Sequence, residues 1–317
     1  MSRIFYILYL LFPVICYSQN GQYNSKVAFA VETYAFLKGQ NAALAKVAAQ
    51  FPHLKPNVAA AEKSLKIVFG RAEKNIQQFL KEELNTVQLH SLQNQIDSLL
   101  NQQLVHPIEE EKHAHDFLLK LKERSTNLNN EMLSKGILSF KYHDAPHQEI
   151  ADGHVDFFST ENHPKAEKIS LKIPIPKSWL AQEAQMPETI QQFTSYHGNG
   201  NEKILIVVYD LPEELHGITL TEKSVAALLP PQTKLLRTEP LAIDNLPAFM
   251  IEVEESIKHQ NDSMKVRMLQ FMFLQNQKLY CLQGSIGPVK ADEDMGLEIK
   301  KYEPLFRLIA SKAELDN

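Results

Sequence analysis

The amino-acid sequence predicts an α+β fold in which an N-terminal helical bundle precedes a mainly antiparallel sheet with covering helices. Before Gly136, apolar residues recur at intervals of three and four, which is the helical period. After it they alternate with polar residues, which is the period of strands, and turn-forming residues separate the strand candidates. We therefore divide the chain into a leader over residues 1–18, a helical domain over 19–136 and a sheet domain over 137–317.

Two short helices are expected at the start of the helical domain. Apolar residues recur at helical intervals over residues 27–37 and 42–51, and Gly39 interrupts them. A loop over residues 52–56, which begins and ends with proline, closes the second helix.

Three longer helices are expected after that loop. Asn57 is a good N-cap for the first, and Pro107 is a favoured first-turn residue for the last, which stops at Gly136. Because their apolar stripes must be buried against one another or against the second domain, a small bundle follows. The stripes are Val58, Ala61, Leu65, Val68, Ala72, Ile76 and Phe79, then Val87, Leu92, Ile96, Leu99 and Leu104, then Ala114, Leu118, Leu121, Leu128 and Met132.

Alternating residues predict the strands of the sheet domain. Asp244-Asn245 and Asn261-Asp262 lie between neighbouring strand candidates, as hairpin turns would. One helix is expected over residues 221–229, capped near Thr221, and a terminal helix over 292–311, which Pro304 kinks or divides. The expected strands are residues 137–142, 155–159, 168–175, 203–209, 234–243, 248–257, 265–274 and 279–286.

Residues 1–18 have the composition of a secretory signal peptide. Arg3 supplies the charged start, an apolar run covers residues 4–14, and Ser18 precedes a polar stretch. The run is too short for a membrane-spanning helix, so no transmembrane segment is expected once the signal is removed. Cys16 lies near the cleavage point, but two bulky residues precede it where bacterial lipoproteins have a small one. We therefore expect a secreted or periplasmic protein, cleaved after Ser18, in preference to a lipoprotein.

Removal of the signal leaves Cys281 as the one cysteine of the mature chain. A lone thiol forms no internal disulfide, so the fold must be held by its own core, for which 44% hydrophobic residues suffice. The formal charge is −5 and the chain has no basic block. Nucleic acid is therefore not expected as a partner, because phosphate neutralisation needs clustered Lys and Arg.

Histidine is the unusual chemical resource of this chain, which has twelve, many of them near the predicted domain boundary. Histidine is a common metal ligand and titrates near neutral pH. His113 and His115 are two apart in a predicted helix, so they point in different directions and cannot share a metal ion. Glu110 and His113 fit the Glu-x-x-His pattern of di-iron bundles, but the helical domain has no second such motif.

The better metal candidate comprises His143, Asp144, His147 and His154. Pro146 predicts a turn in this segment, and a turn can bring these four side chains to one side, where they would suit Zn²⁺ or Cu²⁺. A solvated polar connection between two domains explains the same composition equally well, so both interpretations stay open.

Catalytic signatures are missing from the sequence, which has no Gly-x-Ser-x-Gly elbow, His-Glu-x-x-His, Cys-x-x-Cys or phosphate-binding glycine loop. Residues 197–201 are expected to form a tight turn, Cys281 to be a buried thiol, and Trp179 to anchor a core. Met268 and its neighbours at the same strand spacing are expected in a core as well. We therefore favour a non-enzymatic protein without a cofactor.

Several motifs of the sheet domain occur in an order that is typical of one group of domains. KISLKIPIPKSW places Trp179 directly after a proline-bounded strand, and KILIVVYDLP and LTEKSVAALLP follow. LAIDNLPAFMIEVEE and MLQFMFLQNQKLYCLQGSIG then form hairpins before a final helix. Over residues 157–312 this order resembles PsbP-like and DcrB-like domains. The resemblance implies an α/β/α sandwich in an extracytoplasmic protein, and it implies no common enzymatic activity.

Three functions remain open from the sequence. The leading hypothesis is an exported, non-enzymatic protein that binds an envelope protein or a small ligand. The first alternative is a metal-binding or metal-dependent hydrolytic protein that uses His143, Asp144, His147 and His154. The second alternative is an envelope-stress chaperone.

Overall fold

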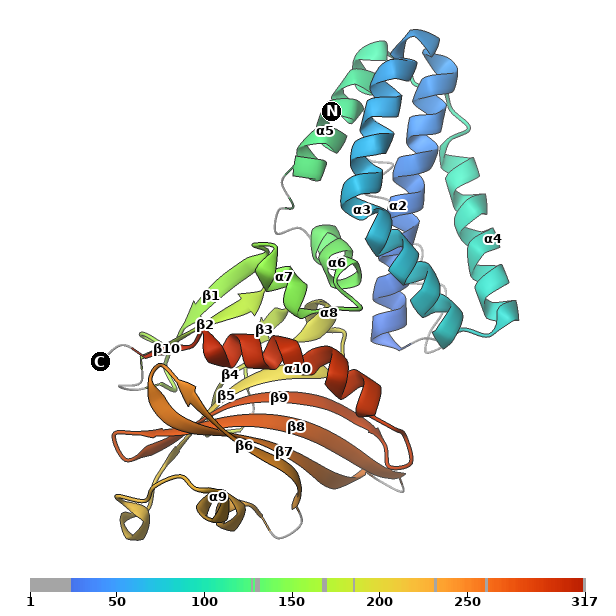
Figure 1. The fold of residues 1–317 in the computed structure, drawn as a ribbon. Helices are drawn as coiled ribbons and strands as arrows, with labels where there is room; N and C mark the ends of the chain where they lie inside the picture. Colours follow the sequence, from blue (N-terminus) through green and yellow to red (C-terminus); the bar gives the residue numbers. More distant parts are fainter. Residues whose placement is uncertain are drawn as a thin grey trace. The chain divides into compact units, whose positions relative to one another are not determined.

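The computed structural model describes residues 24–126, 128, 132–166, 170–184, 186–230, 233–259 and 262–315. The chain divides into two compact units between His143 and Asp144. The first unit is helical and the second combines sheets with helices, which confirms the α+β fold class (Figure 1). The sequence placed the boundary at Gly136, which lies inside a helix, so the helical unit extends further along the chain than expected.

Helix α2 (Ser25–Gln50) is continuous, whereas the sequence predicted two short helices. Asn24 caps it, because its Oδ1 accepts a hydrogen bond from the backbone N of Val27 at 2.8 Å. The expected break at Gly39 is wrong, since this residue is buried within the helix. A glycine inside a helix costs about 1 kcal/mol. Burial on either side outweighs this cost, and consecutive residues from Thr33 to Leu37 are all buried.

Helix α3 (Lys55–Glu83) begins before Asn57, the N-cap that the sequence predicted. The 3₁₀ turn η1 (Pro52–Leu54) leads directly into it, and Pro56 lies in its first turn, where the missing N–H is not needed. Helix α4 (Thr86–Gln103) follows, as expected. None of the helices within the described ranges combines the length and the hydropathy that a bilayer crossing requires.

Two helices, α5 (Glu111–Thr126) and α6 (Met132–Lys141), occupy the region where the sequence predicted one helix from Pro107. Helix α6 also shows that the strand predicted at residues 137–142 is wrong. The reason is Gly136, where a Cβ would lie 2.2 Å from Oγ1 of Thr33. The missing side chain lets α6 pack closely on α2, and α6 then buries Ile137, Leu138 and Phe140.

The second unit contains two antiparallel sheets, with strand orders β1-β2-β10 and β3-β4-β5-β9-β8-β7-β6. All strands expected after residue 142 are present, and β3, β4 and β10 are additional. The strands are β1 (Val155–Ser159), β2 (Leu171–Pro176), β3 (Leu180–Gln182), β4 (Thr189–Thr194), β5 (Glu202–Asp210), β6 (Thr233–Ile243), β7 (Leu246–His259), β8 (Asp262–Gln275), β9 (Lys278–Lys290) and β10 (Glu314–Leu315).

Tight turns with left-handed backbone connect neighbouring strands. Asp244 and Asn245, between β6 and β7, have φ angles of 46° and 64°, which confirms the turn expected there. Asn276 and Gln277 form a similar turn between β8 and β9, with φ angles of 51° and 60°. Positive φ at both central residues matches the twist of paired strands. Asn261, in the other predicted turn, lies outside the described residues.

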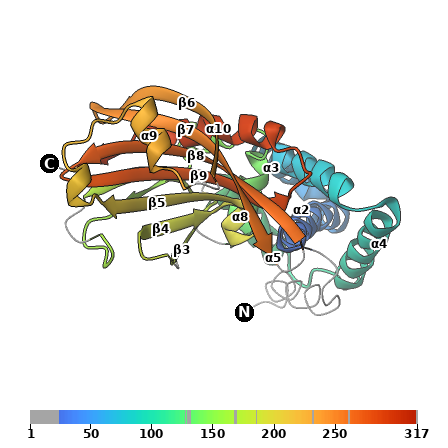
Figure 2. The ribbon, with the colours of Figure 1, turned by 90° about the horizontal axis from the view of Figure 1, so that it is seen from below.

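The larger sheet buries an apolar core on each face (Figures 1 and 2). Helix α10 (Gly296–Ser311) packs into one core, and α9 (Glu222–Leu228) packs into the other. Alternation along β7 divides the side chains between the faces, so that Met250 joins the first core and Ile251 the second. Thr221 caps α9, as predicted.

A missing side chain lets α10 approach the sheet closely. A Cβ on Gly284 of β9 would lie 2.3 Å from ring atoms of Phe306. Helix α10 is undivided although it contains Pro304. Because Gly284 has no side chain, the ring of Phe306 can occupy the space above β9 that the Cβ of any other residue at this position would need.

Ion pairs also connect α10 to the sheet. Glu303 accepts hydrogen bonds from Arg237 at 2.9 Å and from Arg307 at 2.8 Å, and Arg307 pairs with Glu239 at 2.6 Å. Burial pushes the pKa of Glu303 upward, but the hydrogen bonds from Arg237 and Arg307 outweigh burial and hold that pKa below its ordinary value. The hydrogen bond from Arg307 likewise lowers the pKa of Glu239.

Replacing Gly284 by alanine should destabilise the second unit by about 2 kcal/mol, because the added Cβ forces Phe306 out of its position. Urea unfolding measured by circular dichroism checks this value. Gly296→Ala is the control, since a Cβ there would come no closer than 3.3 Å to the flexible Asp294 side chain. Equal stability of the Gly284 and Gly296 variants would contradict the close packing.

Stability should fall in acid partly through Glu303. Its pKa is lowered in the folded chain, so the unfolded chain takes up the proton first, and the stabilisation present above the ordinary pKa of 4.5 is lost as the pH falls through the folded value. Between about pH 5 and about pH 3, the free energy of unfolding should therefore decline less steeply in Glu303→Gln than in the wild type. The exposed Glu293→Gln variant should follow the wild type, and identical slopes in all three proteins would refute the linkage.

Candidate functional site

The first two residues of the predicted metal site have different surroundings. The His143 ring lies 6.3 Å from the ring of Phe140 and 6.0 Å from that of Phe79, between ring centroids. His143 therefore packs on aromatic side chains of the helical unit. Asp144 is exposed and is the first residue of the second unit.

The other two are His147, the first residue of a short helix that the sequence did not predict, and His154, which comes after that helix. Helix α7 (His147–Ala151) begins directly after Pro146, where a turn was expected. The Nδ1 atom of His147 is buried and has no hydrogen-bond partner among the described residues. His154 follows the helix, and its backbone N donates to the carbonyl of Glu149 at 2.9 Å.

No three His, Cys, Asp or Glu side chains of the described residues lie close enough together to hold a metal ion. The arrangement of His143, Asp144, His147 and His154 therefore gives the metal hypothesis no support, and zinc or copper binding stays a prediction for direct measurement.

Other residues singled out in the sequence lie in cores. Cys281 is buried, and burial raises its pKa to about 12, so it remains a protonated thiol at neutral pH. Met268 packs in the same core. Trp179 is buried, and its ring meets that of Tyr302 edge to face, with centroids 6.4 Å apart. These side chains stabilise the fold.

Strained backbone occurs in the left-handed turn α8 (Ser195–Gly198), between β4 and β5. Tyr196 and His197 have φ angles of 49° and 52°, which L-residues rarely adopt and which often mark functional segments. The Ser195 hydroxyl donates to the carboxylate of Glu202, and these residues are only 1% and 4% exposed. Because the cluster is closed to ligands, we assign it a structural role. The tight turn expected at residues 197–201 is confirmed.

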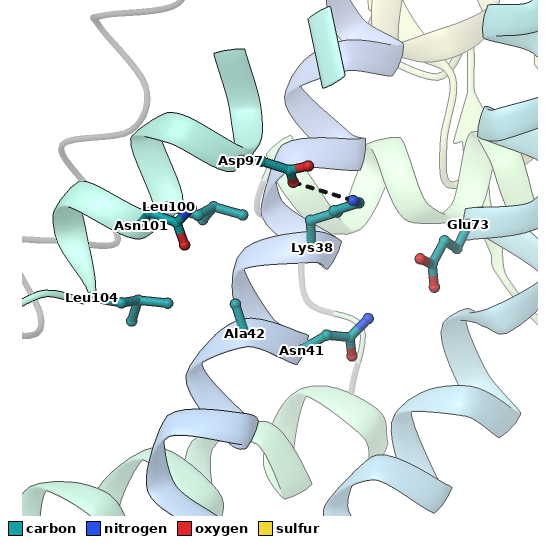
Figure 3. Close-up of a pocket in the computed structure, with 8 residues that line it drawn as sticks. All are labelled: Lys38, Asn41, Ala42, Glu73, Asp97, Leu100, Asn101 and Leu104. Carbon is teal, nitrogen blue, oxygen red and sulfur yellow. Dashed lines mark hydrogen bonds and ion pairs between the residues drawn. The ribbon is translucent and has the colours of Figure 1, made fainter. Parts of the chain in front are cut away.

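A groove in the helical unit, between α2, α3 and α4, is open to solvent and carries several polar side chains (Figure 3). We call it the α2–α4 groove. Its volume is about 480 Å³, which lies within the range of small-molecule sites. It is lined by Lys38, Asn41 and Ala42 of α2, Glu73 of α3, and Asp97, Leu100, Asn101 and Leu104 of α4 and its C-terminus.

Polar contacts fix the chain at one end of the α2–α4 groove. The Lys46 ammonium of α2 donates to the carbonyl oxygens of Leu104 and His106. Nε2 of Gln50 donates to the carbonyl of Ile108 at 2.6 Å, and the backbone N of Ile108 donates to Oε1 of Gln50 at 2.8 Å. Long polar side chains thus connect α2 to the segment after α4, and the space beside the small Ala42 stays open.

An ion pair crosses the groove further along α2. Nζ of Lys38 lies 3.3 Å from Oδ1 of Asp97, and the two side chains are 34% and 54% exposed. Exposed pairs of this kind contribute about 0–1 kcal/mol. Glu73 extends toward the groove from α3 (Figure 3), and it makes no hydrogen bond or ion pair with another described residue.

The described lining of the groove supplies groups that can contact a small molecule. Among its described lining residues there is no Ser, Thr, Cys, His or Tyr, so no hydroxyl or thiol nucleophile and no imidazole base. Two carboxylates, one ammonium and two amides can instead make hydrogen bonds to a polar ligand. Leu100 and Leu104 supply apolar contact.

Sequence reasoning did not single out these residues. Lys38, Asn41 and Ala42 are spaced at i, i+3 and i+4, which places them on one helix face. That spacing is also the pattern of an ordinary solvated face. Only the position of Glu73 on a different helix, brought opposite Asp97, distinguishes the groove from such a face.

Metal analysis of protein purified without a histidine tag tests the histidine segment. We expect zinc and copper well below one ion per chain after dialysis, because no three His, Cys, Asp or Glu side chains of the described residues are grouped closely enough to hold a metal ion. One ion per chain in the wild type, lost in His143→Ala and His147→Ala, would contradict this and establish the metal-binding alternative.

No family model and no curated protein matches this sequence. A crystal structure from Bacteroides thetaiotaomicron aligns with a TM-score of 0.29 and 8% identity, over 46% of this chain and 45% of that protein, so less than half of it is spanned. LpqN, involved in cell envelope biogenesis of Mycobacterium tuberculosis, aligns with a TM-score of 0.30 and 11% identity, over 55% of this chain and 98% of LpqN. Neither likeness is strong enough to show a shared fold, and the PsbP-like resemblance stays a prediction.

Proposed function

We propose that this protein is an exported, non-enzymatic binding protein whose helical unit takes a small polar ligand into the α2–α4 groove. The observation that carries the proposal is the lining of this groove. It combines polar groups that have no partner among the described residues, such as the Glu73 carboxylate, with the apolar side chains of Leu100 and Leu104. Binding sites for small molecules have this combination, in which a few polar groups orient the ligand and apolar surface contributes affinity.

The size of the groove favours a small ligand over a protein partner. A stable protein interface buries roughly 800 Å² on each side. The large exposed apolar side chains of the helical unit, such as Ile67 on α3, Val87 on α4 and Leu119 on α5, are distributed over different helices. A space of about 480 Å³ instead matches a compact molecule.

Export rests on the sequence, because residues 1–18 lie outside the described residues. Mass analysis of the secreted protein tests it directly, with a mature chain that begins at Gln19 as the expected result. A lipid-modified chain that begins at Cys16 would place the protein on a membrane surface instead. The chaperone alternative stays a prediction, and absence of any effect on the aggregation of an unfolded client would dismiss it.

Filling the groove should abolish binding. We expect Ala42→Trp to remove the heat signal of a bound compound in calorimetric titrations with amino acids, diamines, monosaccharides and dicarboxylates, because the indole occupies the ligand volume. Circular dichroism verifies that the variant is folded.

Ala60→Trp is the matched control, since Ala60 is exposed on α3 and does not line the groove. It should bind as the wild type does. Binding that survives in Ala42→Trp, or a panel in which no compound binds the wild type, would contradict the proposed function.

A further inference from the structure

We infer that the ligand of the α2–α4 groove is a small organic cation whose primary ammonium or guanidinium group binds between Glu73 and Asp97. This inference rests on the proposed function and deepens it, because it names the chemical class of the ligand. It follows from the charge balance of the lining, from the weakness of the Lys38–Asp97 ion pair, and from the position of the apolar lining residues.

The lining carries an excess of negative charge. Glu73 and Asp97 contribute two carboxylates, and Lys38 contributes the one cation among the described lining residues. Because Lys38 pairs with Asp97, the carboxylate of Glu73 remains without a partner among the residues that the structure describes. A second cation would neutralise the charge of the Glu73 carboxylate, whereas the excess negative charge of the lining would repel an anionic ligand.

Lys38 shows that an alkyl ammonium fits in this space. Its Nζ lies 3.3 Å from Oδ1 of Asp97, and 5.8 Å from the ring centroid of Tyr34. The Lys38–Asp97 pair is exposed, and exposed ion pairs contribute little to stability, so little is lost when this pair breaks. A ligand cation can therefore share or replace the Lys38 ammonium at little cost.

The remaining lining indicates what the rest of the ligand resembles. Leu100, Leu104 and Ala42 offer apolar surface for a short methylene chain. The amides of Asn41 and Asn101 have no hydrogen-bond partner among the described residues, and each can donate to or accept from a second polar group. An aliphatic diamine and a basic amino acid both have a cation, a methylene chain and a second polar group.

Isothermal titration calorimetry at low ionic strength tests the inference, because salt screens exposed charges. The probes are cadaverine, L-arginine, the zwitterionic L-norleucine, which has no net charge, and the anionic glutarate. We expect the two cationic probes to bind the wild-type chain, and Glu73→Gln to weaken them about tenfold through loss of one charged contact. Glu62→Gln is the matched control, because Glu62 lies on the same helix, is exposed and does not line the groove.

The Lys38→Met variant distinguishes a diamine ligand from a basic amino acid. A diamine competes with the Lys38 ammonium, so cadaverine should bind this variant about threefold more tightly. L-arginine can pair its carboxylate with Lys38, so its binding should weaken instead. The ligand type is identified by two results together. The probe of that type binds the wild type more tightly than the other cation does, and its affinity changes in Lys38→Met in the direction given above.

Three results would overturn the inference. One is equal affinity of the cationic probes for the Glu73→Gln and Glu62→Gln variants, with both variants folded by circular dichroism. Another is binding of norleucine or glutarate, abolished by Ala42→Trp, without binding of either cation, which would leave the proposed function intact. The third is failure of every probe to bind, which would count against the groove as a ligand site altogether.

Discussion

The burial of α2 is the constraint on which the helical unit depends. Consecutive residues from Thr33 to Leu37 are all buried, so this helix must be covered on several sides at once. Helices α3 and α6 cover it, and Gly136 allows α6 to come close. Covering by α4 is less complete, because α2 presents Lys38, Asn41 and the small Ala42 there. The groove is therefore a consequence of which residues α2 offers to each neighbour.

In the second unit both faces of the larger sheet must be covered, and no disulfide among the described residues helps to hold the covering elements. Helix α10 covers one face and approaches the sheet closely over Gly284. Glu303 of this helix also accepts hydrogen bonds from Arg237 of the sheet and from Arg307. The buried polar groups of Ser195 and Glu202 satisfy one another at the strained turn α8. The strained turn of this unit is thus buried, and the groove proposed to receive a ligand belongs to the helical unit.

Periodicity predicted most elements of the fold, since long alternating strands such as β7 and β8 bury one core on each face. It failed where tertiary packing overrides local signals. Gly39 and Gly136 were interpreted as helix ends, but both lie inside helices. At Gly136 the missing side chain leaves space for Thr33 of the neighbouring helix, a contact that exists only in the folded chain. β4 (Thr189–Thr194) was missed because Gln191 and Gln192 break its alternation. The groove was missed because Glu73 and Asp97 are distant in sequence and fit no motif.

Binding of a small cation between Glu73 of α3 and Asp97 of α4 can be observed by nuclear magnetic resonance of the side-chain amides. In a titration of ¹⁵N-labelled protein with cadaverine or L-arginine, the NH₂ signals of Asn41 and Asn101 should shift in a saturable way. The NH₂ signals of Gln78 on α3 and Gln102 on α4, which do not line the groove, should stay in place. Saturable shifts confined to other parts of the molecule, or no shifts at all, would contradict cation binding in the α2–α4 groove.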